Sequence, residues 1–326
     1  MTLLGGLDIG GTKCAVTLGK VHERGIDLLA RHSFPTPRTP QEALKLLADT
    51  LERLLEENRS EGRLQAIGIS CGGPLDSRFG IVLSPPNLPG WDSIDCVGPM
   101  RERFGVPVGL QNDANACAMA EWKWGAGQGC DNMIFLTFGT GMGAGLILNG
   151  RLYTGTNDMA GEAGHIRLAS DGPVGYGKAG SFEGFCSGGG IALLARERAE
   201  TALAEGGNGD APAFCPSIGD LDAITTQKVG EAARQGDRLA LDIFETVGRR
   251  LGQALAILVD VLNPERIVIG SIYGRQQALL EPVVRRELAR EALPLSLEVC
   301  QIMPAGLGEN VGDYASLSIA SSMLGA

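Results

Sequence analysis

The stretch LDIGGTKCAVTLG, residues 7–19, joins two apolar runs through a glycine turn that carries a threonine and a lysine. Glycines accept positive φ and let backbone N–H groups approach an anion without a Cβ in the way. The pattern predicts a turn between two strands that either holds a phosphate or is an ordinary glycine-kinked hairpin. The stretch alone leaves both readings open, because glycine-rich hairpins are common.

A second stretch, LTFGTGMGAGLILNG at residues 136–150, repeats that design. Two matched hairpins indicate a duplicated domain, and two such loops can hold a polyphosphate from both sides. The residues expected to contact the phosphates are Gly10, Gly11, Thr12, Lys13, Gly139, Thr140, Gly141 and Gly143. Asp8 ends the first strand and could hold Mg²⁺ through water, or it could simply cap the turn.

Length and charge narrow the class of protein. A chain of 326 residues exceeds what one hydrophobic core usually organises, so two domains are expected. The formal net charge of -10 disfavours nucleic acid and anionic membranes as partners. The N-terminus has no signal-peptide pattern, and no apolar run reaches membrane length. Eight cysteines without a CxxC pair indicate reduced thiols, no disulfides and a cytoplasmic location.

Alternating strand and helix patterns predict an α/β fold. Thr39, Pro40 and Glu42 have the form of a capping box, which predicts a helix from Pro40 to about Asn58. Strands are expected at 64–70, 107–111, 266–270 and 297–302. Helices are expected from residue 113 and over 237–262, 275–291 and 313–324.

Six motifs in this order resemble the ROK family of sugar kinases and repressors, which belongs to the actin, hexokinase and heat-shock ATPase superfamily. They are LDIGGTK, LQNDANACA, FGTGMGAG, AGEAGH, GSFEG and LNPERIVIG. The resemblance implies two ribonuclease-H-like (actin-like ATPase) domains flanking a deep cleft that binds ATP, Mg²⁺ and a hexose. It implies a small domain of residues 1–112 plus 305–326 and a large domain of residues 113–304 that carries the dimer contacts.

On this resemblance, Asp113 is the expected catalytic base, delivered by the strand that ends in Gln111 and Asn112. A carboxylate within reach of a sugar hydroxyl can orient it and take its proton as the phosphoryl group transfers. A helix N-terminus at Asp113 is expected to keep it ionised, which weakens it as a base. The alternative is that Asp113 is only a helix cap.

The resemblance also supplies the sugar-binding residues. They are Gly73, Asn87, Asn112, Asp113, Glu162, His165 and Glu183. A sugar pocket needs several polar groups, because each hydroxyl both donates and accepts. Asn87 could instead be a turn residue before Pro89, and His165 a hydrogen-bonded core histidine.

Two segments depart from the family. Val174, Tyr176 and Ser181 stand where most members have three zinc-binding cysteines, so no zinc is expected, and packing of Val174, Tyr176 and Phe182 should hold that loop. In GSIYGR, residues 270–275, Gly270 and Ser271 are expected to line adenosine, unless they serve only in packing.

The sequence therefore predicts an ATP- and Mg²⁺-dependent kinase of a hexose or N-acetylhexosamine, acting at the 6-hydroxyl as a cytoplasmic homodimer. Glucose, N-acetylglucosamine, N-acetylmannosamine, mannose, fructose and allose all remain possible substrates. A sugar-responsive repressor is disfavoured, because only six residues precede Leu7. A sugar-binding sensor without kinase activity is the alternative. A chaperone-like ATPase would lack AGEAGH and the Asn112-Asp113 motif.

Overall fold

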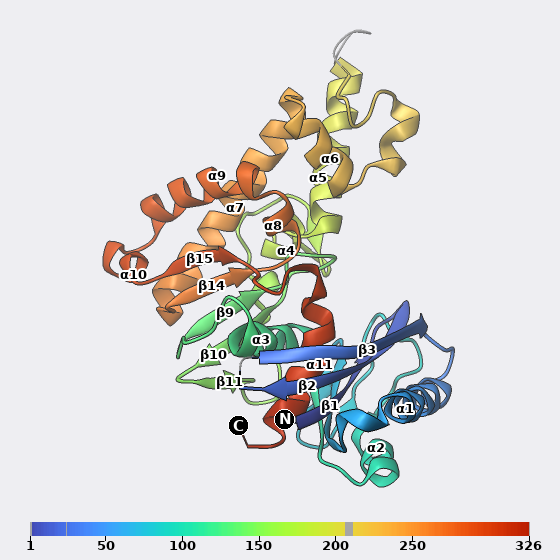
Figure 1. The fold of residues 1–326 in the computed structure, drawn as a ribbon. Coiled ribbons are helices and arrows are strands. Elements are labelled where there is room, and N and C mark those ends of the chain that lie inside the picture. The colour runs from blue at the N-terminus through green and yellow to red at the C-terminus, as the bar shows by residue number, and fades with distance from the viewer. Residues whose placement is uncertain (1, 24, 206–210, 326) are drawn as a thin grey trace. The chain divides into compact units, whose positions relative to one another are not determined.

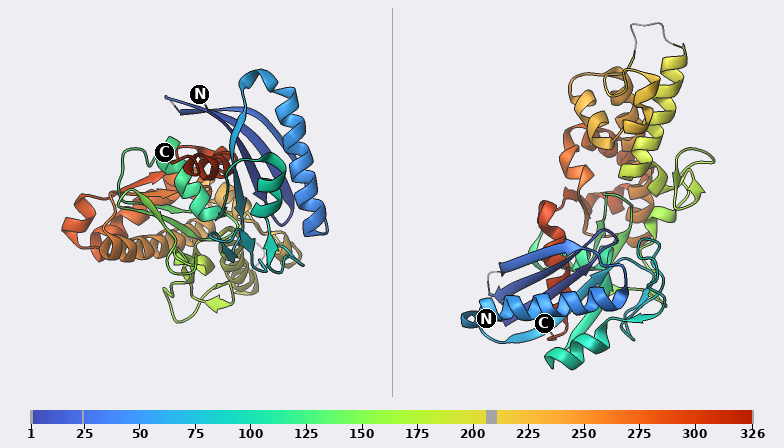
Figure 2. Two further views of the ribbon diagram at one scale, coloured as in Figure 1. Left: turned by 90° about the horizontal axis from the view of Figure 1, so that it is seen from below. Right: turned by 90° about the vertical axis from the view of Figure 1, so that its right-hand side faces the viewer.

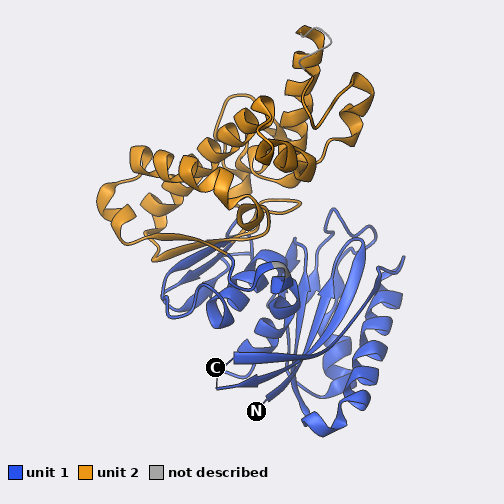
Figure 3. Cartoon of the chain, turned by 45° about the horizontal axis from the view of Figure 1, so that its top comes forward, with its two compact units in different colours: residues 1–135, 145–161, 305–326 blue, residues 136–144, 162–304 orange. Residues whose placement is uncertain are grey.

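The structure is a computed structural model that describes residues 2–23, 25–205 and 211–325 (Figure 1). The chain divides into two compact units (Figure 3). Unit 1 comprises Met1–Phe135, Gly145–Gly161 and Ala305–Ala326, and unit 2 comprises Leu136–Ala144 and Glu162–Pro304. Residues 113–135 and 145–161 thus group with the N-terminal residues, whereas the sequence analysis assigned them to the large domain. The functional domain boundaries stay a prediction.

The first sheet has the strand order β3-β2-β1-β4-β8. Its strands are β1 (Thr2–Ile9), β2 (Lys13–His22), β3 (Gly25–Pro35), β4 (Leu64–Cys71) and β8 (Val108–Asn112). The helices of unit 1 are α1 (Pro40–Glu57), α2 (Val97–Phe104), α3 (Asp113–Trp124) and α11 (Val311–Ser322). Three short strands, β5 (Leu75–Asp76), β6 (Ile81–Val82) and β7 (Ile94–Asp95), form a small separate sheet, and single turns lie at η1 (Arg59–Glu61) and η4 (Gly308–Asn310).

Helices cover both faces of this sheet (Figures 1 and 2). Successive side chains of a strand point to opposite faces, so Leu7 and Ile9 join α1 in one core while Leu4 packs with α11 in another. On the face of the sheet that packs against α11, Gly68 has no side chain, and a Cβ there would come within 1.9 Å of the carbonyl oxygen of Ser316. A glycine at this position therefore allows α11 to approach the sheet.

The parallel strands β1, β4 and β8 end at one edge of the sheet. Ile9 pairs with Cys71, and Cys71 pairs with Asn112. Ligands of open α/β sheets bind beyond the carboxyl ends of the strands. The register therefore brings the residues that follow these strands, including Gly10 and Asp113, to the edge where a ligand is expected.

The second sheet has the order β11-β10-β9-β14-β15, which matches the first sheet strand for strand in chain order. Its strands are β9 (Met133–Leu136), β10 (Ala144–Leu148), β11 (Arg151–Tyr153), β14 (Arg266–Ile269) and β15 (Gln301–Pro304). The expected duplicated α/β fold is confirmed. In each sheet, a glycine turn joins the first strand to the second in chain order.

Most of unit 2 is helical (Figure 1). Its helices are α4 (Phe182–Phe185), α5 (Gly188–Glu205), α6 (Thr226–Arg234), α7 (Arg238–Leu262), α8 (Ile272–Arg275), α9 (Gln277–Glu291) and α10 (Pro294–Glu298). A short hairpin joins β12 (Val174–Gly175) to β13 (Lys178–Ala179), and single turns lie at η2 (Ala163–His165) and η3 (Ile218–Ala223).

Most predicted elements are present, with local differences. Thr39 caps α1 by accepting a hydrogen bond from the backbone N–H of Glu42 at 3.3 Å. The strand expected at 297–302 is wrong in its first half, because Pro294 occupies the first position of α10 and favours a helical turn there. The helix expected from 275 begins at Gln277, after the separate turn α8.

All eight cysteines lie in the described residues and are free thiols, and seven of them are buried. In the described part of the chain, no helix combines the length and the apolar character that a membrane crossing requires.

Candidate active site

The first loop, residues 10–12, is open and exposed. The backbone N–H of Gly10 donates to the carbonyl oxygen of Lys13 at 3.1 Å, and the Thr36 hydroxyl donates to the carbonyl oxygen of Gly10 at 2.5 Å. Within the described chain, the N–H groups of Gly11 and Thr12 make no hydrogen bond. Two adjacent free N–H donors are a feature that can bind an anion such as phosphate.

Asp8 precedes this loop and is half-buried. Burial, followed by the nearby carboxylates of Asp113 and Asp313, raises the pKa of Asp8 to about 6, while Lys13 and Arg31 lower it. A divalent cation at this point would relieve the repulsion between the carboxylates. The donor set therefore fits Mg²⁺ held by Asp8 and by substrate phosphates.

Asp113 begins α3 directly after β8. Asn112 is the helix cap, since its side-chain oxygen accepts a hydrogen bond from the N–H of Asn115 at 2.7 Å. Asp113 is exposed, and one of its oxygens accepts from the N–H of Ala114 at 2.8 Å. Desolvation by the surrounding protein nevertheless raises the pKa of Asp113 above its usual value, against the backbone hydrogen bonds that lower it.

Two expectations about Asp113 need correction on these contacts. The N-cap residue of α3 is Asn112, so the Asp113 side chain does not serve as the helix cap. The helix N-terminus does not dominate its ionisation, because desolvation has the larger effect on its pKa. The carboxylate is therefore a better proton acceptor than the sequence suggested.

Asn87 and Gly73 lie on loops that follow the same sheet. Leu88 donates its N–H to the carbonyl oxygen of Pro85 at 3.0 Å, so Asn87 occupies a tight turn. A Cβ on Gly11 would come within 2.4 Å of the Asn87 carbonyl oxygen, and only glycine permits this approach. Gly73 is exposed, and a Cβ there would meet nothing within 4 Å. The turn at Asn87 thus supports the first loop, while no steric need explains Gly73.

The second loop, residues 137–143, is held by bonds within itself. The N–H of Gly139 donates to the carbonyl oxygen of Gly141 at 3.2 Å, and the N–H of Gly143 donates to the Thr137 hydroxyl at 2.8 Å. The N–H groups of Thr140 and Gly141 make no hydrogen bond within the described residues. This loop also presents two adjacent free donors.

Two neighbouring helices hold the second loop from outside. Glu183 on α4 accepts a hydrogen bond from the N–H of Met142 at 3.0 Å. Gly188 at the start of α5 donates its N–H to the carbonyl oxygen of Gly139 at 2.7 Å. The sequence analysis assigned Glu183 only to the sugar, and its bond to the loop was not foreseen.

His165 and Glu162 come from the turn η2, which packs on the same loop. A Cβ on Gly164 would lie 2.1 Å from the carbonyl oxygen of Met142. Glu162 is exposed and His165 is half-buried. The Nδ1 atom of His165 is buried and has no hydrogen-bond partner among the described residues, and Tyr176 lies edge-on at 5.5 Å between ring centroids. His165 therefore does not fit a hydrogen-bonded core histidine.

The loop at residues 174–182, for which packing of Val174, Tyr176 and Phe182 was expected, is held differently. Val174 is 51% exposed and Tyr176 is 70% exposed, so only Phe182 packs in the core as predicted. Ser181 caps α4 by accepting from the N–H of Gly184 at 3.1 Å, and the Lys178 ammonium donates to the carbonyl oxygen of His165 at 2.7 Å. Hydrogen bonds and the buried ring of Phe182 therefore hold this loop together.

Among the described residues, no group of three or more His, Cys, Asp or Glu side chains is placed to hold a metal ion. Valine, an exposed tyrosine and a capping serine do not make a zinc site with one histidine.

A cavity of about 910 Å³ lies within unit 2, beside the second loop. Its lining includes Gly139 and Thr140, Gly188 and Gly189 at the start of α5, residues 224–227, Glu231, Arg234, Ser271 and Gln276. Arg234 donates to the side-chain oxygen of Gln276 at 2.7 Å, which fixes that wall. Ser271 lines the cavity, whereas Gly270 is buried and donates its N–H to the carbonyl oxygen of Leu136 in β9. Contact of either residue with adenosine stays a prediction.

Two parts of this cavity were missed by sequence reasoning. The run Gly188-Gly189-Gly190 opens α5, and glycines at a helix start were an available signal for an anion site. The wall from Ile224 to Arg234 has no comparable motif, because it comes to the loop only through the packing of α6.

Comparison with known proteins gives consistent matches. The model of the ROK family matches residues 4–321. A glucokinase of Streptomyces coelicolor is 32% identical over 329 residues, which cover 98% of both chains. The crystal structure of a ROK family glucokinase from Streptomyces griseus, in complex with glucose and AMPPNP, is 31% identical with a TM-score of 0.75 and covers 98% of this chain and 99% of its own.

A regulator has the same fold. The crystal structure of a ROK family transcriptional regulator, a homolog of the Escherichia coli MLC protein, is 25% identical with a TM-score of 0.83. The match covers 98% of this chain and 78% of the regulator. Both a kinase and a regulatory role therefore occur among proteins similar to this chain.

Proposed function

The chain belongs to the ROK family, and from this premise we propose that it transfers the γ-phosphoryl group of ATP to the 6-hydroxyl of a hexose or N-acetylhexosamine. The similarity to glucokinases supports a sugar kinase. The observation that carries the proposal is Asp113, an exposed carboxylate with a raised pKa at the carboxyl edge of the first sheet. A structural cap would not need this combination.

In the proposed reaction, Asp113 accepts a hydrogen bond from the sugar hydroxyl and takes its proton as the oxygen attacks the γ-phosphorus. Asn112 orients the start of α3 and offers its amide group to the sugar. Phosphoryl transfer depends mainly on position and on stabilised charge, so a carboxylate held at one point suffices as base. ADP is the leaving group.

We assign the phosphates to the two glycine loops, through the free N–H groups of Gly11, Thr12, Thr140 and Gly141. Lys13 and the Thr12 and Thr140 hydroxyls are exposed and can add donors. Mg²⁺, held by Asp8 through water, would neutralise charge on the phosphates. The adenosine is assigned to the cavity of unit 2, which the phosphate-binding loop borders.

The sugar is assigned to Gly73, Asn87, Asn112, Asp113, Glu162, His165 and Glu183. Glu183 has one oxygen on the second loop, so a sugar hydroxyl at its other oxygen would link sugar binding to phosphate binding. His165 serves the sugar without a zinc ion, and we propose that the protein carries none. A cytoplasmic homodimer without nucleic-acid or membrane partners completes the proposal.

The second candidate is a sugar-binding regulatory protein without kinase activity. The TM-score of 0.83 with a transcriptional regulator favours it specifically. Such a protein would bind the sugar and would not turn over ATP.

A coupled ADP-release assay separates the two candidates. The purified chain is tested with ATP and Mg²⁺ against the six sugars named above. Turnover that depends on one sugar supports the kinase and identifies its substrate. Binding of a sugar by calorimetry without any ADP release would overturn the kinase proposal in favour of the regulator.

A further inference from the structure

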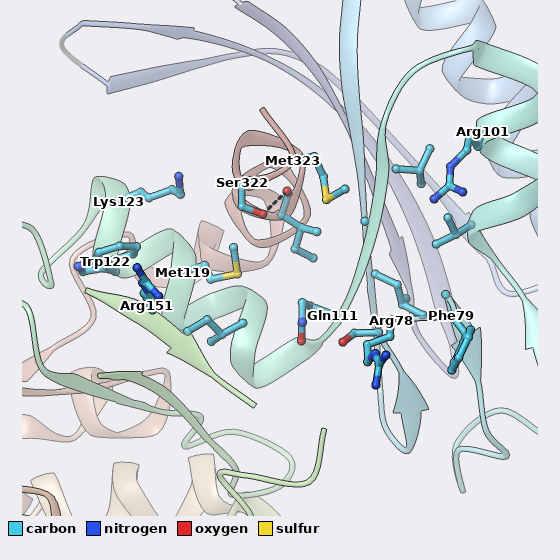
Figure 4. A pocket seen from close by; sticks show the side chains of 18 of the residues that line it. Arg78, Phe79, Arg101, Gln111, Met119, Trp122, Lys123, Arg151, Ser322 and Met323 are labelled. Carbon is cyan, nitrogen blue, oxygen red and sulfur yellow. Dashed lines mark hydrogen bonds between the residues drawn. The ribbon is translucent and has the colours of Figure 1, made fainter. Parts of the chain in front are cut away.

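A separate cavity of about 630 Å³ lies within unit 1 (Figure 4). It is bordered by β8, α3, α11, the turn before β11 and the loop around Arg78. None of its lining residues belongs to the two glycine loops or to the proposed sugar ligands. The cavity is therefore distinct from the proposed active site.

The lining of this cavity is strongly basic. It contains Arg78, Arg101, Lys123 and Arg151, and it contains no aspartate or glutamate. Among the described residues, none of these three arginines forms an ion pair, and Lys123 bonds only to the Ser321 hydroxyl at 3.3 Å. Four cations without counterions are unusual in a chain whose formal net charge is -10. We call this cavity the basic pocket.

The cations lie at the two ends of the basic pocket (Figure 4). Lys123 and Arg151 occupy one end beside Trp122, while Arg78 and Arg101 lie toward the other. Burial lowers the pKa of the Lys123 ammonium, as expected for a cation that no carboxylate compensates.

Apolar side chains also line the basic pocket, and those of Met119 and Met323 lie between its two ends (Figure 4). Leu110, Met119, Leu152, Ile319 and Met323 contribute to this lining. Gly109 allows the Met323 side chain to pack against β8, because a Cβ there would come within 2.7 Å of the Met323 sulfur. A basic pocket of this kind favours a ligand with a compact carbon skeleton and an anionic group at each end.

We propose that the basic pocket binds a small organic bisphosphate, such as a bisphosphorylated sugar. Guanidinium groups match phosphate oxygens through paired N–H donors, and three of the four cations are arginines. A cavity of about 630 Å³ is within the usual size of small-ligand sites. Inorganic phosphate would use one end only and would bind more weakly.

The basic pocket also adjoins the elements that carry Asp113. Gln111 lines it and accepts a hydrogen bond from the Asn115 side-chain nitrogen at 3.2 Å. Asn115 in turn donates its N–H to Asn112. A bound ligand would therefore contact both β8 and α3, the two elements that meet at Asp113.

Isothermal titration calorimetry on the full chain at 0.1 M salt tests the proposal, and it needs no turnover. The probes are a hexose bisphosphate, a hexose monophosphate, inorganic phosphate and the free hexose. We expect one bisphosphate per chain, at least about tenfold tighter binding than the monophosphate, and no displacement by glucose with a non-hydrolysable ATP analogue.

The test variant is Arg78→Gln with Arg151→Gln, which removes one exposed cation from each end. The matched control is Arg53→Gln with Arg63→Gln, which removes two exposed arginines outside the basic pocket. The test variant should weaken bisphosphate binding at least about tenfold, with the control within about twofold of wild type. Absence of saturable binding, equal losses in both variants, or displacement by active-site ligands would each overturn the proposal.

Discussion

The two glycine loops share a sequence design but differ in how they are held. The first loop, residues 10–12, has one backbone bond to Lys13 and two bonds from Thr36, whose N–H donates to the carbonyl oxygen of Thr12 and whose hydroxyl donates to that of Gly10. The second loop, residues 137–143, has bonds within itself and further bonds to Glu183 and Gly188. The first is exposed and the second is braced by two helices.

What the two loops keep in common is a pair of adjacent free donors. These are the N–H groups of Gly11 and Thr12 in the first loop and of Thr140 and Gly141 in the second. The two copies thus share the free donors that we propose for phosphate binding, while their supporting contacts differ. Substitutions that disturb the support should therefore act differently in the two loops.

Among substitutions that disturb the two loops, the largest effect is expected from Gly11→Ala. Its Cβ would come within 2.4 Å of the Asn87 carbonyl oxygen, so the loop must move and its two donors with it. Loss of positioned donors should lower kcat/KM about 10²- to 10³-fold. The matched control is Gly139→Ala, whose Cβ has its nearest neighbour, the Ser271 hydroxyl, at 4.0 Å. Equal losses in both variants would contradict the account.

The next effect is expected from Glu183→Ala, which leaves the Met142 N–H without its acceptor. We expect kcat/KM to fall about 10²-fold, with weaker binding of both the sugar and the nucleotide. Glu183→Gln keeps an acceptor and should lose less. If sugar affinity alone fell, Glu183 would act on the sugar without bracing the loop.

Asp8 should make stability depend on pH. Its pKa of about 6 in the folded protein exceeds the ordinary value of 3.8, so folding favours the protonated form. This contribution to stability is full below about pH 4 and is lost as the pH rises through 6. The free energy of unfolding of Asp8→Asn minus that of wild type, measured with urea in the absence of Mg²⁺, should therefore rise by about 2 kcal/mol from pH 4 to pH 8.

The control for that measurement is Asp222→Asn, at a side chain that is 84% exposed. Its stability difference from wild type should not change between the two pH values. A pH-independent effect of Asp8→Asn would show that Asp8 titrates normally in the folded protein.

The smallest effect is expected from removal of metal. The Ser181 hydroxyl accepts from the N–H of Gly184 and the Lys178 ammonium donates to the carbonyl oxygen of His165, so the loop before Glu183 is held without a metal ligand. Treatment with EDTA should leave Tm unchanged, and elemental analysis should find less than one zinc per chain. A fall in Tm with stoichiometric zinc would show that the loop has metal ligands after all.

Local sequence patterns predicted much of the fold. The apolar runs around residues 10–12 and 137–143 predicted both hairpins, and Thr39 with Pro40 predicted the start of α1. Long-range contacts account for most of what was missed. The bond from Glu183 to the second loop, the cavity wall at residues 224–234 and the basic pocket each depend on segments that meet only in the folded chain.

The position of Asp113 in the fold could be predicted from the sequence, but the direction of its pKa shift could not. Its position follows from the strand and helix patterns on either side. Its raised pKa depends on how closely the folded protein surrounds the carboxyl, which no local pattern records. Exposure of Val174 and Tyr176 was missed for the same reason.

The most direct measurement follows transfer of the γ-phosphoryl group from labelled ATP to the hexose in wild type, Asp113→Asn and Asp222→Asn. The account predicts that Asp113→Asn lowers kcat about 10²- to 10⁴-fold while calorimetry still shows sugar binding, and that Asp222→Asn transfers at the wild-type rate. Transfer by Asp113→Asn at the wild-type rate would contradict the central claim that this carboxylate is the base.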